Sequence, residues 1–259
     1  MQKKLPDLIL LFTILALVLC GLIMILSASS VKSEKLFNNS YHFFFNQLKY
    51  LLLALIFSAI AYKIKYKKVQ ELVPFLLIFA FISLFLVLIP SIGIMAGGSR
   101  RWLPLGPINF QPSELAKLIT VIYLAAYIEK NKDNMKNFKK GIFPPLIVVA
   151  IIFGLILVEP DLGTAVTLAL VAASVIFVGG IKISSFIGLG ILSGVLFFLS
   201  ILMEHYRRER LFTFLNPWQD PLDSGYHIIQ SLLALGSGGL FGVGAGNSHQ
   251  KFLYLPEPG

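Results

Sequence analysis

Residues 142–181 read IFPPLIVVAIIFGLILVEPDLGTAVTLALVAASVIFVGGI, two long apolar runs separated only by the acidic turn Glu159-Pro160-Asp161. A helix needs about 20 mostly apolar residues to cross the hydrocarbon core of a bilayer, where unpaired backbone polar groups are costly. Both runs approach that length without a charged residue. The stretch therefore predicts two membrane helices joined by a short turn.

Similar apolar stretches fill most of the chain. Of its 259 residues, 56% are hydrophobic and only 14% charged, whereas a soluble domain carries about 25% charged residues. A water-soluble globular protein is therefore excluded. We expect an all-α polytopic membrane protein with about seven transmembrane helices, near residues 8–30, 43–62, 72–94, 113–128, 142–158, 162–181 and 183–203.

The net charge of +9 does not indicate nucleic-acid binding, because the basic residues lie in short runs between the apolar stretches. The single cysteine, Cys20, excludes a disulfide framework and a thiolate metal site. The four histidines are scattered without the spacing of a metal site.

Lysine and arginine favour the cytoplasmic ends of membrane helices. With a cytoplasmic N-terminus, the inner side receives twelve lysines and the short outer loops receive only four basic residues. We therefore expect this orientation, which places residues 204–259 outside. In that tail, the run from Tyr226 to Leu235 has the spacing of an amphipathic helix.

Ionisable residues at membrane depth are functional candidates. Glu114 and Lys117 are three positions apart, which puts them on one helix face, and Gln111 and Ser113 precede or begin that helix, with Ser113 as a possible N-cap. The pattern fits either a capped helix start with an intrahelical ion pair or the lining of a functional cavity.

Two outer segments carry further candidates. Asp161 either caps the helix that follows it or lines an exterior cavity. Arg101 and Trp102 either anchor the chain among lipid headgroups or bind a substrate, because an arginine fork binds phosphate oxygens well.

Taken in order, four stretches resemble the SEDS family of cell-wall proteins (shape, elongation, division and sporulation), which includes FtsW, RodA and SpoVE. They are GSRRWL at 98–103, QPSELAK at 111–117, PDLGT at 160–164, and the run from Phe214 to Pro256. The stretches GNSHQK at 246–251 and YLPE at 254–257 are more similar to the FtsW and SpoVE branch. The resemblance makes the whole chain one SEDS domain, with a helix bundle over 1–203 and a large extracytoplasmic loop over 204–259.

This resemblance implies a peptidoglycan glycosyltransferase of the bacterial cytoplasmic membrane that polymerises lipid II during cell division. It also implies a divalent cation, Mg²⁺ or Mn²⁺, and no organic cofactor. The implied partners are a class B penicillin-binding transpeptidase and other division proteins.

Family members have about ten membrane helices, and their candidate general base is an aspartate that follows the Leu-Pro-Glu matching 255–257. By the resemblance, that aspartate would lie just beyond Gly259. We therefore expect the chain to be a truncated member, inactive by itself. Glu114, Lys117 and Asp161 are then the supporting catalytic candidates. The candidates for substrate binding are Arg101, Trp102, Gln111, Ser113 and again Lys117.

Two other functions remain open on sequence grounds. A lipid flippase or transporter would also carry paired charges in a helix bundle, although we find no internal repeat of the kind that many transporters show. A non-catalytic scaffold that recruits the transpeptidase to the division site is the second.

Overall fold

The computed structural model describes residues 7–96, 99–106, 108–203, 205–239, 242–244 and 247. They fall into two compact units. We call residues 63–196 the core unit, and residues 1–62 with 197–259 the flanking unit. Each is described by itself.

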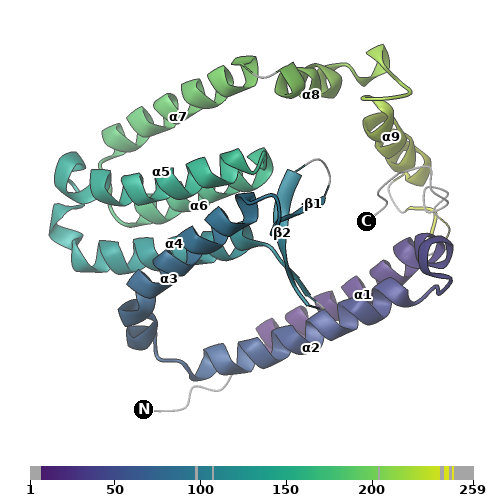
Figure 1. Cartoon of the computed structure of the whole chain (residues 1–259), viewed down its shortest axis with the longest axis horizontal. Helices are drawn as coiled ribbons and strands as arrows, with labels where there is room; N and C mark the ends of the chain where they lie inside the picture. The colour runs from purple at the N-terminus through teal and green to yellow at the C-terminus, as the bar shows by residue number, and fades with distance from the viewer. Residues whose placement is uncertain are drawn as a thin grey trace. The chain divides into compact units, whose positions relative to one another are not determined.

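The core unit is built on four helices that pack side by side (Figure 1): α3 (Tyr66–Leu88), α4 (Pro112–Lys130), α5 (Phe143–Val158) and α6 (Leu162–Val178). Small residues on three of them, Ala80, Ala116 and Ala165, are fully buried, which lets the helix backbones approach closely. Larger aliphatic side chains complete this cluster; they are Leu84, Ile119, Ile152, Ile156 and Leu168.

The ends of these helices follow from local sequence. Pro112 occupies the first turn of α4, where the missing N–H has no helical partner to lose. Helix α5 ends at Val158, two residues before Pro160, and a proline cannot continue a helix. Helix α6 begins after Asp161, whose side chain caps it. Between α4 and α5 lie a 3-10 turn (Lys132–Asn134) and a π-helical turn (Phe138–Ile142).

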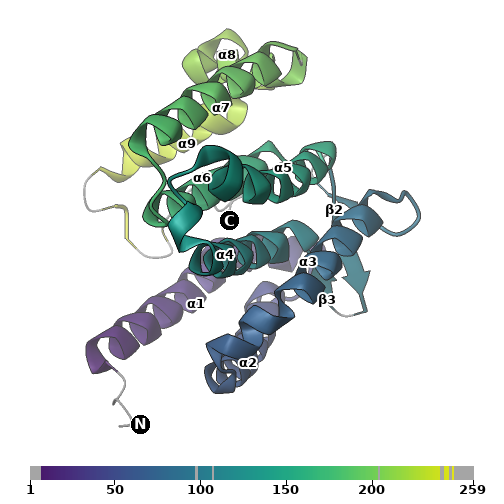
Figure 2. The same cartoon turned by 90° about the vertical axis from the view of Figure 1, so that its left-hand side faces the viewer.

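A small antiparallel sheet joins α3 to α4, in the order β1 (Ile94–Ala96), β2 (Ser99–Leu105) and β3 (Ile108–Phe110). In Figure 2, β2 lies beside α3, and β3 pairs with β2. The sheet corrects the all-α prediction. It also corrects the predicted helix over 72–94, whose last residues lie outside the helix. That helix runs from Tyr66 to Leu88 instead, since the residues just before the sheet form turns.

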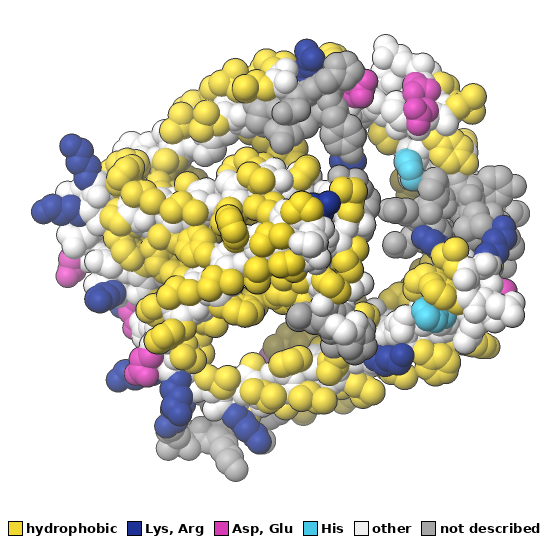
Figure 3. Space-filling model, in the orientation of Figure 1, with side chains coloured by type: hydrophobic (Ala, Val, Ile, Leu, Met, Phe, Trp, Pro, Cys, Tyr) yellow, Lys and Arg dark blue, Asp and Glu magenta, His cyan; other side chains and the backbone are white. Residues whose placement is uncertain are grey.

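The two ends of the core unit differ in charge. Figure 3 shows basic side chains, with a few acidic ones among them, at the left-hand end, where α3 begins and α4 ends, and apolar side chains over the helix flanks. The basic residues at that end lie in the three connections and in the adjoining helix ends: Lys63, Lys65, Lys67, Lys68, Lys130, Lys132, Lys136, Lys139, Lys140 and Lys182. A 19-residue helix such as α4 spans about 28 Å. The lysines therefore lie about a bilayer core away from the sheet.

The flanking unit contains α1 (Leu8–Phe37), α2 (His42–Lys63), α8 (His205–Leu215), a 3-10 turn (Pro217–Gln219) and α9 (Tyr226–Gly238). Helix α1 extends seven residues beyond the expected end at 30, and it ends at Asn38, which has a left-handed φ of 51°. The Phe37 and His42 rings stack across the turn into α2, 3.8 Å apart. Helix α9 covers the run predicted to be amphipathic. The remaining helix, α7 (Ile183–Met203), passes from the core unit into the flanking unit.

Among the described residues, five helices are long and apolar enough to cross a membrane: α1, α2, α3, α5 with its preceding π-helical turn, and α7. Helix α6 is apolar but shorter, with 17 residues. The protein is thus a mostly helical chain with several candidate membrane spans, as predicted. The total of seven spans stays a prediction.

Candidate functional site

Chain connectivity brings four segments to one end of the core unit. Helix α3 leads into the sheet there, α4 begins there, α5 ends there and α6 begins there. This is the end opposite the lysine-rich connections. The polar residues singled out in the sequence lie on these four segments, so the fold gathers them although up to 60 positions separate them in the chain.

Arg101 lies at an irregularity in β2. Trp102 pairs with Ile94 and Arg100 with Met95, so Arg101 has no partner residue in the described register of β1. Such a bulge inserts one extra residue into a strand and re-aims its side chain. The Arg101 Nη1 atom lies 3.3 Å from Asp161 Oδ2, at the start of α6.

Asp161 has two functions in this arrangement. As the N-cap of α6, its carboxylate accepts hydrogen bonds from the Thr164 backbone N–H at 3.1 Å and from the Thr164 hydroxyl at 2.8 Å. It also pairs with Arg101, and its side chain is only 6% exposed. The structure thus confirms the helix-cap interpretation and adds an ion pair with Arg101; the lining of an exterior cavity stays a prediction.

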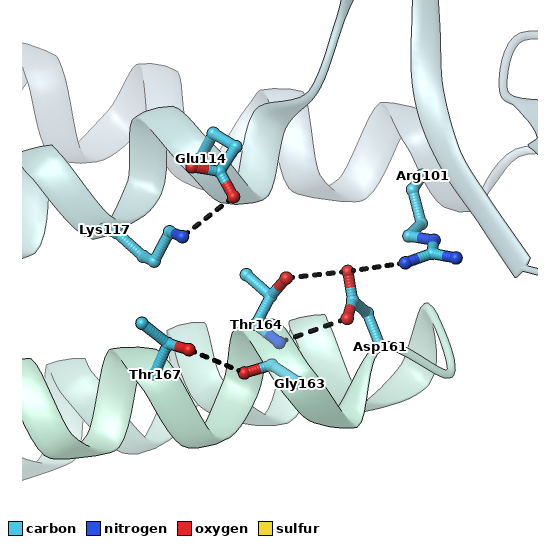
Figure 4. Close-up of polar contacts among 7 residues, drawn as sticks. All are labelled: Arg101, Glu114, Lys117, Asp161, Gly163, Thr164 and Thr167. Atoms are coloured by element: carbon cyan, nitrogen blue, oxygen red, sulfur yellow. Dashed lines mark hydrogen bonds and ion pairs between the residues drawn. The ribbon is translucent and has the colours of Figure 1, made fainter. Parts of the chain in front are cut away.

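Glu114 and Lys117 form the second ion pair, with 2.8 Å between Lys117 Nζ and Glu114 Oε1. In Figure 4 both side chains point from α4 toward α6, while Thr164 and Thr167 point from α6 toward α4. The pair and Arg101–Asp161 thus lie on facing elements of the core unit. Lys117 is the better covered partner, with 21% of its side chain exposed against 57% for Glu114.

The remaining predicted residues lie around these pairs. Gln111 is the N-cap residue of α4, and its side chain forms no capping hydrogen bond. The N-cap prediction for Ser113 is wrong, because Pro112 already begins the helix and Ser113 lies in its first turn. The Ser113 hydroxyl is buried without a partner in the described part of the chain. Trp102 is half-buried on β2, and no described contact joins it to the ion pairs.

Glu159 is a further acid at this end of the core unit, and it is not among the residues predicted from the sequence. Its side chain is 1% exposed, and neither carboxylate oxygen has a hydrogen-bond partner among the described residues. Burial, reinforced by the nearby Asp161 charge and opposed by Arg101, raises the pKa of Glu159 from 4.5 to about 8. The Glu-Pro-Asp turn placed this acid next to a candidate residue, but its burial could not be predicted from the sequence.

The expected general base cannot be placed from the described residues. The resemblance puts it just beyond Gly259, and Gly259 itself lies outside the described residues, as does the Leu-Pro-Glu at 255–257. The position of the base therefore stays a prediction. The acids that the structure does place at this end of the core unit are Glu114, Glu159 and Asp161.

The residues that the structure describes do not fit a divalent cation. Across the described ranges, no three His, Cys, Asp or Glu side chains gather where they could hold a metal ion. The Asp161 carboxylate is already engaged by Arg101 and Thr164. The divalent cation stays a prediction from family resemblance, and no chemical step at this site is derived through it.

The chain matches the family model described as "Cell cycle protein", which covers FtsW, RodA and SpoVE, over residues 7–259. It is 40% identical over 257 residues to stage V sporulation protein E of Bacillus subtilis, covering 99% of this chain and 70% of that protein. It is 42% identical over 244 residues to a protein of Coxiella burnetii named "Probable peptidoglycan glycosyltransferase FtsW", covering 94% and 65%. The chain therefore spans about two thirds of the length of these relatives.

Solved structures with the same fold are known. A peptidoglycan synthase complex, described as coordinating polymerization and crosslinking, contains a chain that is 29% identical with a TM-score of 0.67; the match covers 90% of this chain and 66% of that one. The rod-shape-determining protein RodA of Thermus thermophilus is 23% identical with a TM-score of 0.61, covering 97% and 66%. The second likeness concerns the fold alone.

Proposed function

The chain belongs to the FtsW, RodA and SpoVE family, and from that membership we propose that it is a peptidoglycan glycosyltransferase of the FtsW type that polymerises lipid II during cell division. The observation that carries the proposal is the gathering of Arg101–Asp161 and Glu114–Lys117 at the lysine-poor end of the core unit. The names of the Coxiella burnetii relative and of the synthase complex whose chain is 29% identical support the same activity.

Polymerisation of a lipid-linked sugar requires two kinds of catalytic help. A base removes the proton of the acceptor hydroxyl as the new glycosidic bond forms, and positive charge stabilises the diphosphate as its bond to the sugar breaks. Arg101 and Lys117 suit the second task, since both cations lie on facing elements and neither is fully covered. For the base, the family resemblance points to an aspartate outside the described residues.

The location of the site agrees with this substrate. Lipid II carries its sugars and diphosphate at the membrane surface, so its polymerase needs cationic groups near the ends of its helices. Arg101, Lys117 and Asp161 lie near the starts of α4 and α6 and in the adjoining strand. With the lysine-rich end in the cytoplasm, this end faces the outer leaflet of the bacterial cytoplasmic membrane.

The proposed partner is a class B penicillin-binding transpeptidase. The structural neighbour at 29% identity is part of a synthase complex that couples polymerization with crosslinking, and a polymerase that delivers strands for crosslinking benefits from a transpeptidase bound to it. Other division proteins complete the proposed set of partners.

Reconstitution separates this function from its two rivals. The protein, extended to the full length of its relatives, is combined with its transpeptidase and lipid II in proteoliposomes with Mg²⁺ or Mn²⁺, and glycan products are resolved on a gel. A ladder of polymer that needs the protein supports the glycosyltransferase. Movement of lipid II between leaflets without polymer would instead identify a flippase, and transpeptidase binding with neither activity would identify a scaffold.

A further inference from the structure

Glu159 is a buried acid without an assigned role, and it follows α5 directly at the candidate site. Its two carboxylate oxygens find no donor among the described residues, and its side chain is 1% exposed. A charged carboxylate in such surroundings is strongly disfavoured, since neither water nor a hydrogen bond replaces its lost hydration. Geometry alone therefore favours the neutral, protonated acid, and the raised pKa of about 8 agrees with it.

Among the described residues, the charged groups around Glu159 are few. Asp161, two residues later, disfavours ionisation of Glu159, and Arg101 from β2 favours it. On α4, which packs against α6, Glu114 and Lys117 pair with each other. Arg100 lies on the same strand as Arg101, and its Nε atom is buried without a partner in the described part of the chain.

We propose that Glu159 holds a proton beside the Arg101–Asp161 pair and so keeps this cluster electrically neutral for the uptake of an anionic lipid diphosphate. The inference rests on the proposed function and adds a positioning residue to its substrate site. Glu159 itself does not touch the substrate. Its protonation state sets the net charge of the three side chains that the substrate meets at Arg101.

The charge count explains why the proton matters. With Glu159 neutral, Arg101 and Asp161 cancel, and Arg101 can turn toward a phosphate through its Nε group, which has no partner among the described residues. When Glu159 releases its proton to solvent, the three side chains carry a net negative charge. Arg101 is then drawn to two carboxylates, and the cluster repels an incoming diphosphate.

A binding experiment over pH tests this directly. The affinity of the protein in lipid nanodiscs is measured for undecaprenyl diphosphate and, in a parallel arm, for inorganic pyrophosphate, from pH 6.5 to 9.5. Because only the protonated cluster binds well, the wild-type affinity is expected to fall about tenfold by pH 9. If the affinity for pyrophosphate depends on pH as the affinity for the lipid does, the site recognises the diphosphate group alone. If only the lipid binds, the lipid chain is also required.

The substitution Glu159→Gln keeps the shape and neutrality of the protonated acid, so its affinity is expected to stay nearly constant over this range. The matched control Glu71→Gln removes an exposed carboxylate on α3 and should follow the wild-type profile. The diphosphate itself also changes protonation over this pH range, but it does so equally for every variant. The difference between the variants therefore reports on the protein alone. If Glu159→Gln does not accumulate, Glu159→Leu is also neutral at every pH and takes its place.

The outcomes separate the inference from the proposed function. Wild-type binding that follows the same profile as Glu159→Gln would overturn the role of Glu159 while leaving the glycosyltransferase intact. An absence of diphosphate binding at every pH would overturn both. Failure of both neutral variants to accumulate would also contradict the inference, since a neutral side chain should be accepted at this position.

Apparent melting temperature provides a readout that needs no substrate. A folded pKa of about 8 against an ordinary value of 4.5 means that the folded state holds a proton which the unfolded chain releases, so wild-type stability declines as pH rises from about 4.5 to about 8 and then levels off. Glu159→Gln should therefore gain stability over wild type across that window and gain nothing below it. A constant difference between the two proteins from pH 4 to 9 would show that Glu159 is not held neutral.

Discussion

Asp161 shows how one side chain can serve both structure and function. Its Oδ1 atom accepts the backbone hydrogen bond that caps α6. Its Oδ2 atom accepts hydrogen bonds from the Thr164 hydroxyl and from Arg101. The cap needs only an oxygen acceptor, whereas the ion pair needs a charge. The two functions can therefore be separated by substitution.

Asp161→Asn is expected to keep the cap of α6 and lose the charge, whereas Asp161→Ala loses both. The alanine variant should be destabilised by about 1 kcal/mol more than the asparagine variant, which is the usual value of an N-cap. Apparent melting temperatures in detergent, with cell-wall complementation measured in parallel, check this. Full complementation by Asp161→Asn would show that the charge is dispensable.

The candidate site was only partly predictable from its residues. The i, i+3 spacing predicted the Glu114–Lys117 pair, and the Pro-Asp turn predicted a cap at Asp161. The Arg101–Asp161 pair joins residues 60 positions apart, and Arg101 lies at an irregularity of β2 that no local pattern indicates. The burial of Glu159 depends on the same tertiary packing.

At the scale of elements, the turns between the helices differ more from expectation than the helices do. Long apolar runs identify helices because their backbone must be satisfied internally in lipid. The short sheet between α3 and α4 and the π-helical turn before α5 arise instead from backbone pairing and close contacts. These features leave little trace in hydrophobic periodicity.

The π-helical turn contains one such contact at Gly141. A Cβ atom there would collide with the carbonyl oxygen of Asn134 in the backbone. Gly141→Ala should therefore displace the turn that joins α4 to α5 and lower the apparent melting temperature by several degrees, as a shift of about 1 kcal/mol or more does. Gly154→Ala in α5 has open space around it and should leave the melting temperature unchanged or raise it. Equal effects of the two substitutions would contradict the close contact.

For the whole molecule, the charge difference between the ends of the core unit predicts its orientation in the membrane. Lys136 and Lys140 should be cytoplasmic and Trp218 exterior. His249 is also predicted to be exterior, although it lies outside the described residues. Single-cysteine variants at these positions, in a background from which the exposed Cys20 has been removed, can be labelled on intact cells with a membrane-impermeant thiol reagent. Labelling at position 136 from outside would contradict the predicted orientation in the membrane.

The proposed function requires that the cations at the lysine-poor end of the core unit act on lipid II. In a chain extended to the full length of its relatives, Lys117→Ala and Arg101→Ala should each reduce the initial rate of lipid II polymerisation about 10² to 10³-fold, as loss of one electrostatic stabiliser does. Lys117→Ala should also leave protein abundance nearly unchanged, because an i, i+3 pair contributes only about 0.2 to 0.5 kcal/mol.

The most direct measurement is therefore the polymerisation rate of these two variants beside Lys136→Ala, a lysine substitution at the opposite end of the core unit. Lys136→Ala is expected to polymerise like wild type, whereas Lys117→Ala and Arg101→Ala are expected to polymerise far more slowly. Polymerisation by the two site variants at the rate of Lys136→Ala would show that the active site lies elsewhere.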